Sequence, residues 1–294
     1  MGGGTYSVAN SVARSATYGS LSIGDIFTQT TMNNAMNPYG IKVRESRDSE
    51  EHPNSLAIIL GLDVTGSMGS IPHYLIKEGL IGMMGTILQR GIADPQVLFL
   101  GIGDHECDTS PLQVAQFESS DELLDKWLKD VYLEGGGGGN YGESYALAWY
   151  FAAQHTSIDC FEKRQQKGFL FTVGDEPCLK KTPQIFLKNL MGEGQFQNYE
   201  HVELLDKARE KYHVYHLHIK QTASGSRQEV IDSWKQLMND NVIIVDDYHN
   251  IDKVIAEIIL KNTEKIEGPD IKVDIETKPG TEVKITTEDT EIIL

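Results

Sequence analysis

Three acidic residues stand where predicted apolar strands end. Asp63 closes the run SLAIILGLD, Asp104 follows a second apolar run, and Asp175 closes the run GFLFTVGD. Two hydroxyl side chains, Thr65 and Ser67, follow the first acid at alternate positions in the string DVTGSMG. Carboxylate and hydroxyl oxygens in this combination suit Mg²⁺, which keeps part of its water, with Mn²⁺ or Ca²⁺ as alternatives. We therefore predict a cation site with four members, which are Asp63, Thr65, Ser67 and Asp175.

The elements that must position these side chains alternate between strand and helix from residue 55 to residue 261. This alternation predicts an α/β fold with a doubly wound, mostly parallel sheet and helices on both faces. In such a sheet ligands bind outside the carboxyl ends of the strands, so we expect the three acids to lie close together. The expected strands are 55–63, 96–103, 112–117, 168–175, 213–219 and 242–245. The expected helices are 71–90, 121–132, 145–154, 182–190, 202–212, 227–238 and 251–261.

The string D-x-T-G-S-M after a first buried strand resembles the metal-ion-dependent adhesion site of the von Willebrand factor A (VWA) domain. The resemblance covers roughly residues 55–261 and implies a VWA fold, which is Rossmann-like. It implies that Asp63, Thr65 and Ser67 supply the ligands of the first loop, and that Asp175 supplies the acid that follows the fourth strand. Asp104 resembles the acid that often ends the second strand of this family, which need not touch the metal. Asp104 is therefore a candidate for an additional metal or ligand loop.

One element of the family pattern differs in this chain. The family places a Thr in a Gly-rich loop before a helix, and the corresponding string here is G-G-G-N-Y-G, with Gly139 at the place of the Thr. Asn140, Glu143 and Ser144 are the candidates to replace that hydroxyl. The alternative is a metal site that is weakened or lost.

The glycine run from 135 to 139 has two interpretations. A phosphate-binding loop is one, because backbone amides before a helix attract anions. The loop contains no Lys or Arg, however, and Glu134 and Glu143 flank it. A loop that passes close to the metal or its ligand is therefore the favoured interpretation.

Charge and cysteine content restrict the classes of partner and compartment. The 294 residues include 43 acids and 26 bases, for a net charge of −17. This balance argues against a partner that is a nucleic acid or an anionic membrane, since both require a basic face. Three scattered cysteines form no disulfide or zinc pattern. With no apolar stretch long enough for a signal peptide or a membrane span, we expect a cytoplasmic protein, of bacterial or phage origin.

The two ends of the chain differ from the middle in amino-acid composition and in the pattern of apolar residues. Residues 1–54 are rich in Gly, Ser, Thr and Asn, and we expect an irregular N-terminal arm before a VWA-like domain at 55–264. Residues 265–294 are acidic and are expected to form a β-hairpin extension, because apolar and polar residues alternate on either side of Pro279–Gly280. This hairpin is expected either to pack as a ribbon on the main sheet or to pair with another chain.

The function expected from these features is that of a non-enzymatic, metal-dependent protein-binding module. A partner's Asp or Glu would complete the coordination of Mg²⁺, within a multiprotein or ATPase-associated assembly. Two alternatives stay open at this point. One is a metal-dependent hydrolase of the phosphoester class, in which the loop GDHECD supplies His105 as acid or base. The other is a scaffold protein with a degenerate metal site.

Overall fold

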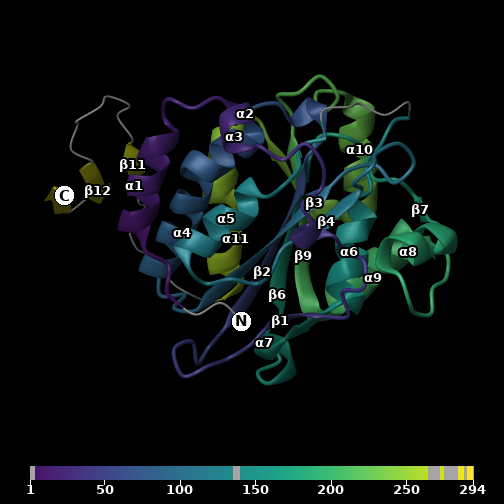
Figure 1. Cartoon of the computed structure of the whole chain (residues 1–294), viewed down its shortest axis with the longest axis horizontal. Helices are drawn as coiled ribbons and strands as arrows, with labels where there is room; N and C mark the ends of the chain where they lie inside the picture. The colour runs from purple at the N-terminus through teal and green to yellow at the C-terminus, as the bar shows by residue number, and fades with distance from the viewer. Residues whose placement is uncertain (1–3, 135–139, 264–271, 275–283, 288–289, 294) are drawn as a thin grey trace.

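The fold is built around a six-stranded sheet with the order β10-β9-β6-β2-β3-β4. In the computed structural model, the described residues are 4–134, 140–263, 272–274, 284–287 and 290–293 (Figure 1). All neighbouring strands of this sheet run parallel except β4, which is antiparallel to β3. The strands are β2 (Leu56–Asp63), β3 (Pro95–Ile102), β4 (Leu112–Val114), β6 (Gly168–Gly174), β9 (Tyr212–Ile219) and β10 (Val242–Val245).

The apolar runs form the central strands because both of their faces are covered. Every residue of β2, β3 and β6 is buried. The register then fixes which strand ends meet, since Asp63 of β2 lies beside Ile102 of β3 and Leu62 lies beside Val173 of β6. The acids at the carboxyl ends of these three strands therefore lie at the same end of the sheet.

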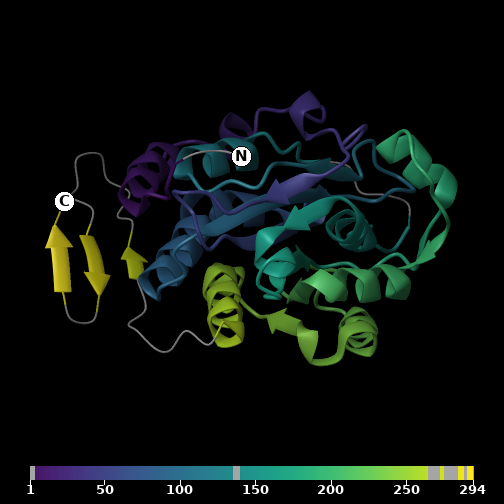
Figure 2. The ribbon, with the colours of Figure 1, turned by 90° about the horizontal axis from the view of Figure 1, so that it is seen from below.

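Helices cover both faces of the sheet, as Figures 1 and 2 show from two directions. One face packs against α1 (Val8–Tyr18), α3 (Ile71–Tyr74), the π-helical turn η3 (Leu75–Gly79), α4 (Leu80–Gln89), α5 (Asp121–Lys129) and α11 (Ile251–Asn262). The other face packs against α6 (Tyr145–Gln154), α8 (Gln184–Met191), α9 (His201–Lys211) and α10 (Gln228–Met238). The prediction of a central, mostly parallel sheet flanked by helices is confirmed.

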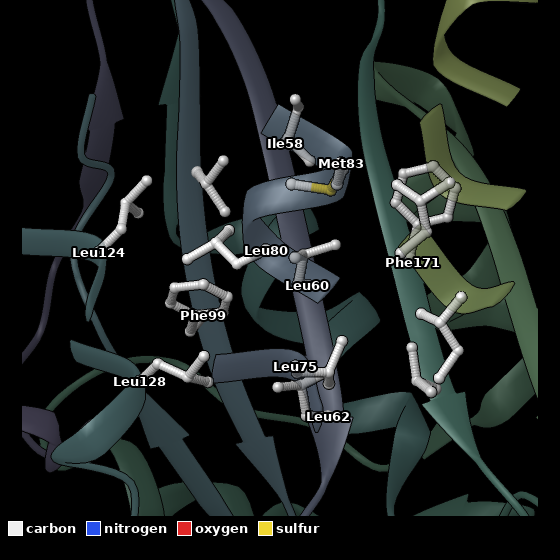
Figure 3. Close-up of a cluster of buried hydrophobic side chains, with 14 of the residues drawn as sticks. Ile58, Leu60, Leu62, Leu75, Leu80, Met83, Phe99, Leu124, Leu128 and Phe171 are labelled. Carbon is white, nitrogen blue, oxygen red and sulfur yellow. The ribbon is translucent and has the colours of Figure 1, made fainter. Parts of the chain in front are cut away.

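Alternate residues of β2 supply the two cores. Ile58, Leu60 and Leu62 point to the α4 side, where Leu80 and Met83 meet them (Figure 3). Ala57 and Ile59 belong to the cluster on the α6 side. A strand that is apolar on both faces is what this two-sided cover requires. The helix predicted for 71–90 is present, but η3 interrupts its α-helical hydrogen bonding between α3 and α4.

The N-terminal arm at 1–54, expected to be irregular, contains regular elements within its described residues 4–54. Helix α1 begins after Ser7, whose side chain accepts a hydrogen bond from the amide of Asn10. The helix then packs on the body of the fold, with Ser15 Oγ donating to Lys77 O and Tyr18 OH donating to the Asp125 carboxylate. Short elements follow it, which are α2 (Ile23–Ile26), η1 (Asn34–Met36) and β1 (Arg44–Ser46). Small polar residues at buried positions of α1 made its sequence look like a loop.

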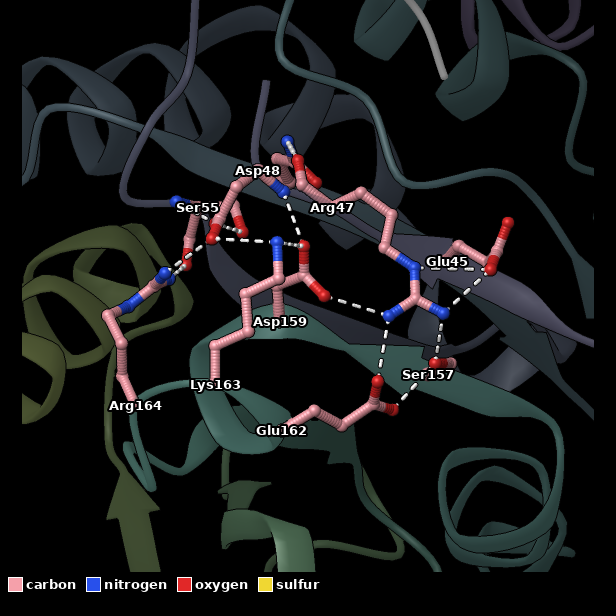
Figure 4. Close-up of polar contacts among 10 residues, drawn as sticks. Glu45, Arg47, Asp48, Ser55, Ser157, Asp159, Glu162, Lys163 and Arg164 are labelled. Atoms are coloured by element: carbon pink, nitrogen blue, oxygen red, sulfur yellow. Dashed lines mark hydrogen bonds and ion pairs between the residues drawn. The ribbon is translucent and has the colours of Figure 1, made fainter. Parts of the chain in front are cut away.

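A polar network fixes the end of this segment beside the start of β2 (Figure 4). Strand β1 pairs with β5 (Thr156–Ile158), which leads into α7 (Asp159–Glu162). Arg47 donates to Asp159 and to Glu162 at 2.8 Å each, and Arg164 pairs with Asp48 at 2.7 Å. Asp159 is nearly fully buried, so these ion pairs are less screened than surface pairs.

The C-terminal residues contain three short strands that pair antiparallel, namely β11 (Lys272–Asp274), β12 (Lys284–Thr287) and β13 (Thr290–Ile293). The turn Pro279–Gly280 and most residues of the predicted hairpin lie outside the described residues. The β-hairpin at 265–294 and the domain boundaries therefore stay predictions. Within the described part of the chain, no helix has the length and apolarity that a membrane span requires.

Candidate functional site

The candidate site lies where the order of the strands changes direction. From β2 the chain continues to β3 and β4 on one side, and it later returns to β6, β9 and β10 on the other. Loops that follow β2 and β6 therefore diverge, and the crevice between them is the usual ligand position in an open α/β sheet. Asp63 is the last residue of β2 and Asp175 directly follows β6. The topology thus brings together the two acids that the sequence singled out.

Asp63 is fully buried and holds the start of its own loop in place. Its Oδ1 accepts hydrogen bonds from the Thr65 amide at 2.9 Å and from the Thr65 hydroxyl at 2.6 Å. Its Oδ2 accepts a hydrogen bond from the Tyr145 hydroxyl at 2.8 Å. Burial raises the pKa of Asp63 to about 7; the hydrogen bonds from Thr65 oppose this rise, and the nearby charge of Asp175 adds to it.

Ser67 joins the two strand ends. It lies in the short helical turn η2 (Gly66–Met68), where its hydroxyl donates to Asp175 Oδ1 at 2.9 Å and lies 3.3 Å from Thr65 Oγ1. Ser67 is exposed, whereas Asp63 and Asp175 are completely buried. A continuous set of oxygens therefore runs from two buried carboxylates to the surface. All four residues of the predicted cation site meet in this set.

The charges of this set are not balanced by the protein. Arg227 pairs with Glu176, the residue after Asp175, and the ion pairs of the described residues include neither Asp63 nor Asp175. Asp175 Oδ2 has no hydrogen-bond partner among the described residues. Burying a carboxylate without compensation is costly. The residues therefore fit a cation, because a divalent ion is the group that would satisfy oxygens of this kind. No cluster of three or more His, Cys, Asp or Glu side chains within the described ranges is placed to hold a metal ion, and the predicted set contains only two acids.

Asp104 lies next to this set at the end of β3, and it is also buried. Its Oδ1 accepts a hydrogen bond from the Glu106 amide at 2.8 Å, and its own amide donates to Asp108 Oδ2 at 2.7 Å. Its Oδ2 has no partner among the described residues. Asp104 therefore organises the GDHECD loop beside the site, and none of its hydrogen bonds goes to Asp63 or Asp175.

The residues that are candidates to replace the missing hydroxyl differ in the hydrogen bonds that their side chains form. Asn140 Nδ2 donates to Glu106 Oε2 at 2.8 Å. Ser144 Oγ accepts from the His105 amide at 2.8 Å and contacts His105 Nδ1 at 2.7 Å. Gly139 lies outside the described residues, as does the glycine run 135–139. The side chains of Asn140 and Ser144 are thus both hydrogen-bonded to the GDHECD loop.

Glu143 is the candidate whose side chain forms no hydrogen bond to the GDHECD loop within the described residues. Its side chain is buried, and its Oε2 has no hydrogen-bond partner in the described part of the chain. Burial is the main cause that raises the pKa of Glu143 to about 10, and the charge of Asp63 is the next largest cause, followed by Asp108 and Asp104. Electrostatically, Glu143 belongs to the same group of carboxylates as Asp63.

Tyr145 is a residue of the site that the sequence analysis did not identify. It is fully buried at the start of α6, and its hydroxyl is the donor to Asp63 Oδ2. A Cβ at position 174 would overlap that hydroxyl, so Gly174 is needed for the close approach. An aromatic residue in an apolar helix carries no sequence signal for this contact, because the same pattern describes an ordinary core position.

Comparisons with known proteins were made by sequence and by structure. No protein-family model matches the chain, and no curated protein matches it. Among solved structures, the pilus adhesin SpaC from Lactobacillus rhamnosus GG in its open conformation is similar, with a TM-score of 0.48 and 10% identity over 82% of this chain. A second form of the same adhesin gives a TM-score of 0.47 and 10% identity over 84% of this chain. The chain spans 36% and 38% of the lengths of these two adhesin chains.

Proposed function

We propose that this chain is a non-enzymatic, metal-dependent protein-binding module of the VWA type. The observation that carries the proposal is the continuous set of oxygens at the ends of β2 and β6. In it, Thr65 bonds to Asp63, and Ser67 bonds to Asp175 while remaining exposed. This is the arrangement that a cation with one side open to a partner requires.

The residues that would hold the ion are Asp63, Thr65, Ser67 and Asp175. Two carboxylates match the charge of a divalent cation, and the two hydroxyls add oxygen donors without adding charge. Mg²⁺ is the preferred ion, with Mn²⁺ or Ca²⁺ as alternatives. When bound, the cation supplies a positive centre that an Asp or Glu of a protein partner can reach at the exposed side of Ser67.

The order of the strands supports the finer fold assignment. Numbered along the chain within the main sheet, the strands follow the order 3-2-1-4-5-6, with the third antiparallel. This is the order of doubly wound, Rossmann-like sheets, whose ligands bind beside the first strand. We extend the proposal to a VWA-like domain at residues 55–264 in a cytoplasmic multiprotein or ATPase-associated assembly, with neither nucleic acid nor membrane as partner.

Calorimetric titration with Mg²⁺ and Mn²⁺ tests the metal claim. Wild-type protein is expected to release or absorb heat with a saturable isotherm, and Asp63→Ala is expected to lose it. Ser70→Ala is a matched control, because Ser70 lies on the same loop and its hydroxyl contacts Tyr248 instead of the acids. Equal isotherms for wild type and Asp63→Ala would refute the proposal.

A second candidate function is the metal-dependent hydrolase of phosphoesters, and one contact favours it. His105 Nδ1 lies 2.7 Å from Ser144 Oγ, beside the acidic group, and His105 Nε2 has no partner among the described residues. A histidine so placed could transfer a proton. Turnover of a generic phosphate ester with Mn²⁺, abolished by His105→Ala, would favour this hydrolase. A cation site that neither binds metal nor turns over substrate would favour the scaffold alternative.

A further inference from the structure

We propose that Glu143 replaces the missing loop hydroxyl and serves the cation site as an outer carboxylate. The inference rests on the proposed function, since it concerns the same cation. It goes beyond the four-residue set, because it adds a third acid from a third segment of the chain. It also selects one residue among the three that the sequence offered as replacements for the hydroxyl, which are Asn140, Glu143 and Ser144.

The backbone of Glu143 is held firmly against the loop that follows Asp175. Its amide donates to Pro177 O at 2.9 Å, and its carbonyl accepts from the Leu179 amide at 2.9 Å. Gly142 makes this approach possible, since a Cβ there would lie 3.0 Å from Pro177 O, at a φ of +147°. The main chain therefore places Glu143 beside Pro177, which follows Asp175 closely in the chain.

The side chain of Glu143 is buried and incompletely bonded. It is 8% exposed, and Oε2 lacks a hydrogen-bond partner within the described residues. Asp175 Oδ2 is a second buried carboxylate oxygen in the same condition. The main-chain bonds of Glu143 to Pro177 and Leu179 hold the two loops together. A positive group bound between these loops would compensate both oxygens, which a buried site otherwise leaves without a partner.

The two competing residues are excluded by their contacts. Ser144 Oγ is engaged by both the amide and the ring of His105, and it is 2% exposed. Asn140 donates to Glu106 in an exposed position. A role at the acids would require Asn140 or Ser144 to give up these bonds, whereas Glu143 Oε2 has no hydrogen bond to give up among the described residues.

Glu143 acts from outside the inner set of ligands. No three acids among the described residues are placed to hold one ion between them, so Asp63, Asp175 and Glu143 do not form an inner cage. Mg²⁺ keeps several of its waters in protein sites, and a carboxylate nearby can accept hydrogen bonds from them. Outer partners of this kind typically change metal affinity by about 10- to 100-fold.

Titration calorimetry with Mg²⁺ and Mn²⁺ tests this assignment. Glu143→Gln, which keeps size and shape, is expected to weaken binding about 10-fold or more. Two controls are matched to it: Glu106→Gln removes one negative charge from the exposed side of the neighbouring loop, and Ser144→Ala removes the adjacent hydroxyl. Both controls are expected to stay within about twofold of wild type, since the exposed charge of Glu106 is screened by salt and the Ser144 hydroxyl bonds to His105 instead of to the acids.

The outcomes separate this inference from the proposal on which it rests. If Asp63→Asn abolishes binding while Glu143→Gln stays within about twofold of wild type, the cation site stands and the role of Glu143 is refuted. If Ser144→Ala weakens binding as much as Glu143→Gln does, the assignment to Glu143 alone is refuted. Absence of any binding to the wild type refutes both claims. Should Glu143→Gln fail to fold by circular dichroism, Glu143→Asp, which keeps the charge but draws it back, is expected to weaken binding in the same direction, and unchanged affinity would overturn the inference.

Discussion

Asp63→Asn is expected to stabilise the metal-free protein at neutral pH while it removes the cation site. In the folded chain, burial chiefly raises the pKa of this carboxyl from 3.8 to about 7. The folded state therefore binds the Asp63 proton more tightly than the unfolded state does. As the pH rises from about 4 to about 7, the unfolded chain loses that proton first, so the wild type loses stability over this window.

The magnitude follows from the gap between the two pKa values. At about 1.4 kcal/mol per pH unit, the gap corresponds to about 4 kcal/mol, and we expect a gain of about 2 to 4 kcal/mol for Asp63→Asn above pH 7. The carboxamide oxygen introduced by this substitution would still accept the hydrogen bonds of Thr65, and its NH₂ group can donate to the Tyr145 hydroxyl. The change therefore removes charge with little loss of bonding. Below about pH 4 the two proteins are expected to be equally stable.

Urea unfolding in the presence of EDTA, followed by circular dichroism at about pH 5 and about pH 8, measures this difference. Saturating Mg²⁺ is then expected to offset most or all of this difference, because an ion at about 100 times its dissociation constant stabilises the wild type by about 2.7 kcal/mol and leaves the variant unchanged. Equal pH dependence in the two proteins would refute the reasoning. So would a variant that is less stable than the wild type at pH 8.

Three further predictions concern the surroundings of the site. Tyr145→Phe removes the donor to Asp63 Oδ2 and is expected to weaken Mg²⁺ binding about 10-fold in calorimetry, with unchanged affinity as the contrary result. Gly174→Ala forces a Cβ onto the Tyr145 hydroxyl and is expected to cost about 1 to 3 kcal/mol in urea unfolding, while Gly24→Ala, which meets nothing within 4 Å, is expected to cost nothing; equal effects would contradict the packing argument. Arg47→Ala removes one of the two cationic partners of the buried Asp159, at the far end of β2, and leaves Lys163 as the other. It is expected to cost about 1 to 3 kcal/mol by the same assay, with Mg²⁺ affinity retained; a loss of affinity would contradict the separation of the two regions.

The strands and the end of the sheet at which the acids lie could be predicted from the sequence, because a strand buried on both faces has a continuous run of apolar residues. The runs that end at Asp63 and Asp175 contain almost only apolar residues, and the structure places them side by side in the sheet. Helix α1 could not be predicted in the same way, since its buried face includes Ser11 and Ser15, which pack by being small instead of apolar.

The site could be predicted only where spacing along the chain determines contact. Thr65 and Ser67 follow Asp63 so closely that a tight turn brings their oxygens together. Tyr145 and Glu143 reach the same place through the packing of α6 and of the loop before it, and no local pattern encodes that packing. Their roles follow from tertiary structure alone.

The central claim, a divalent cation held between the ends of β2 and β6, is tested most directly by crystals grown with Mn²⁺. An anomalous difference map from such crystals is predicted to contain a peak within bonding distance of Asp63 or Asp175 and of Ser67, at about 2.0 to 2.2 Å from their oxygens. Crystals of Asp63→Asn grown in the same way are predicted to lack it. A wild-type map without a peak among these residues, at saturating Mn²⁺, would contradict the account.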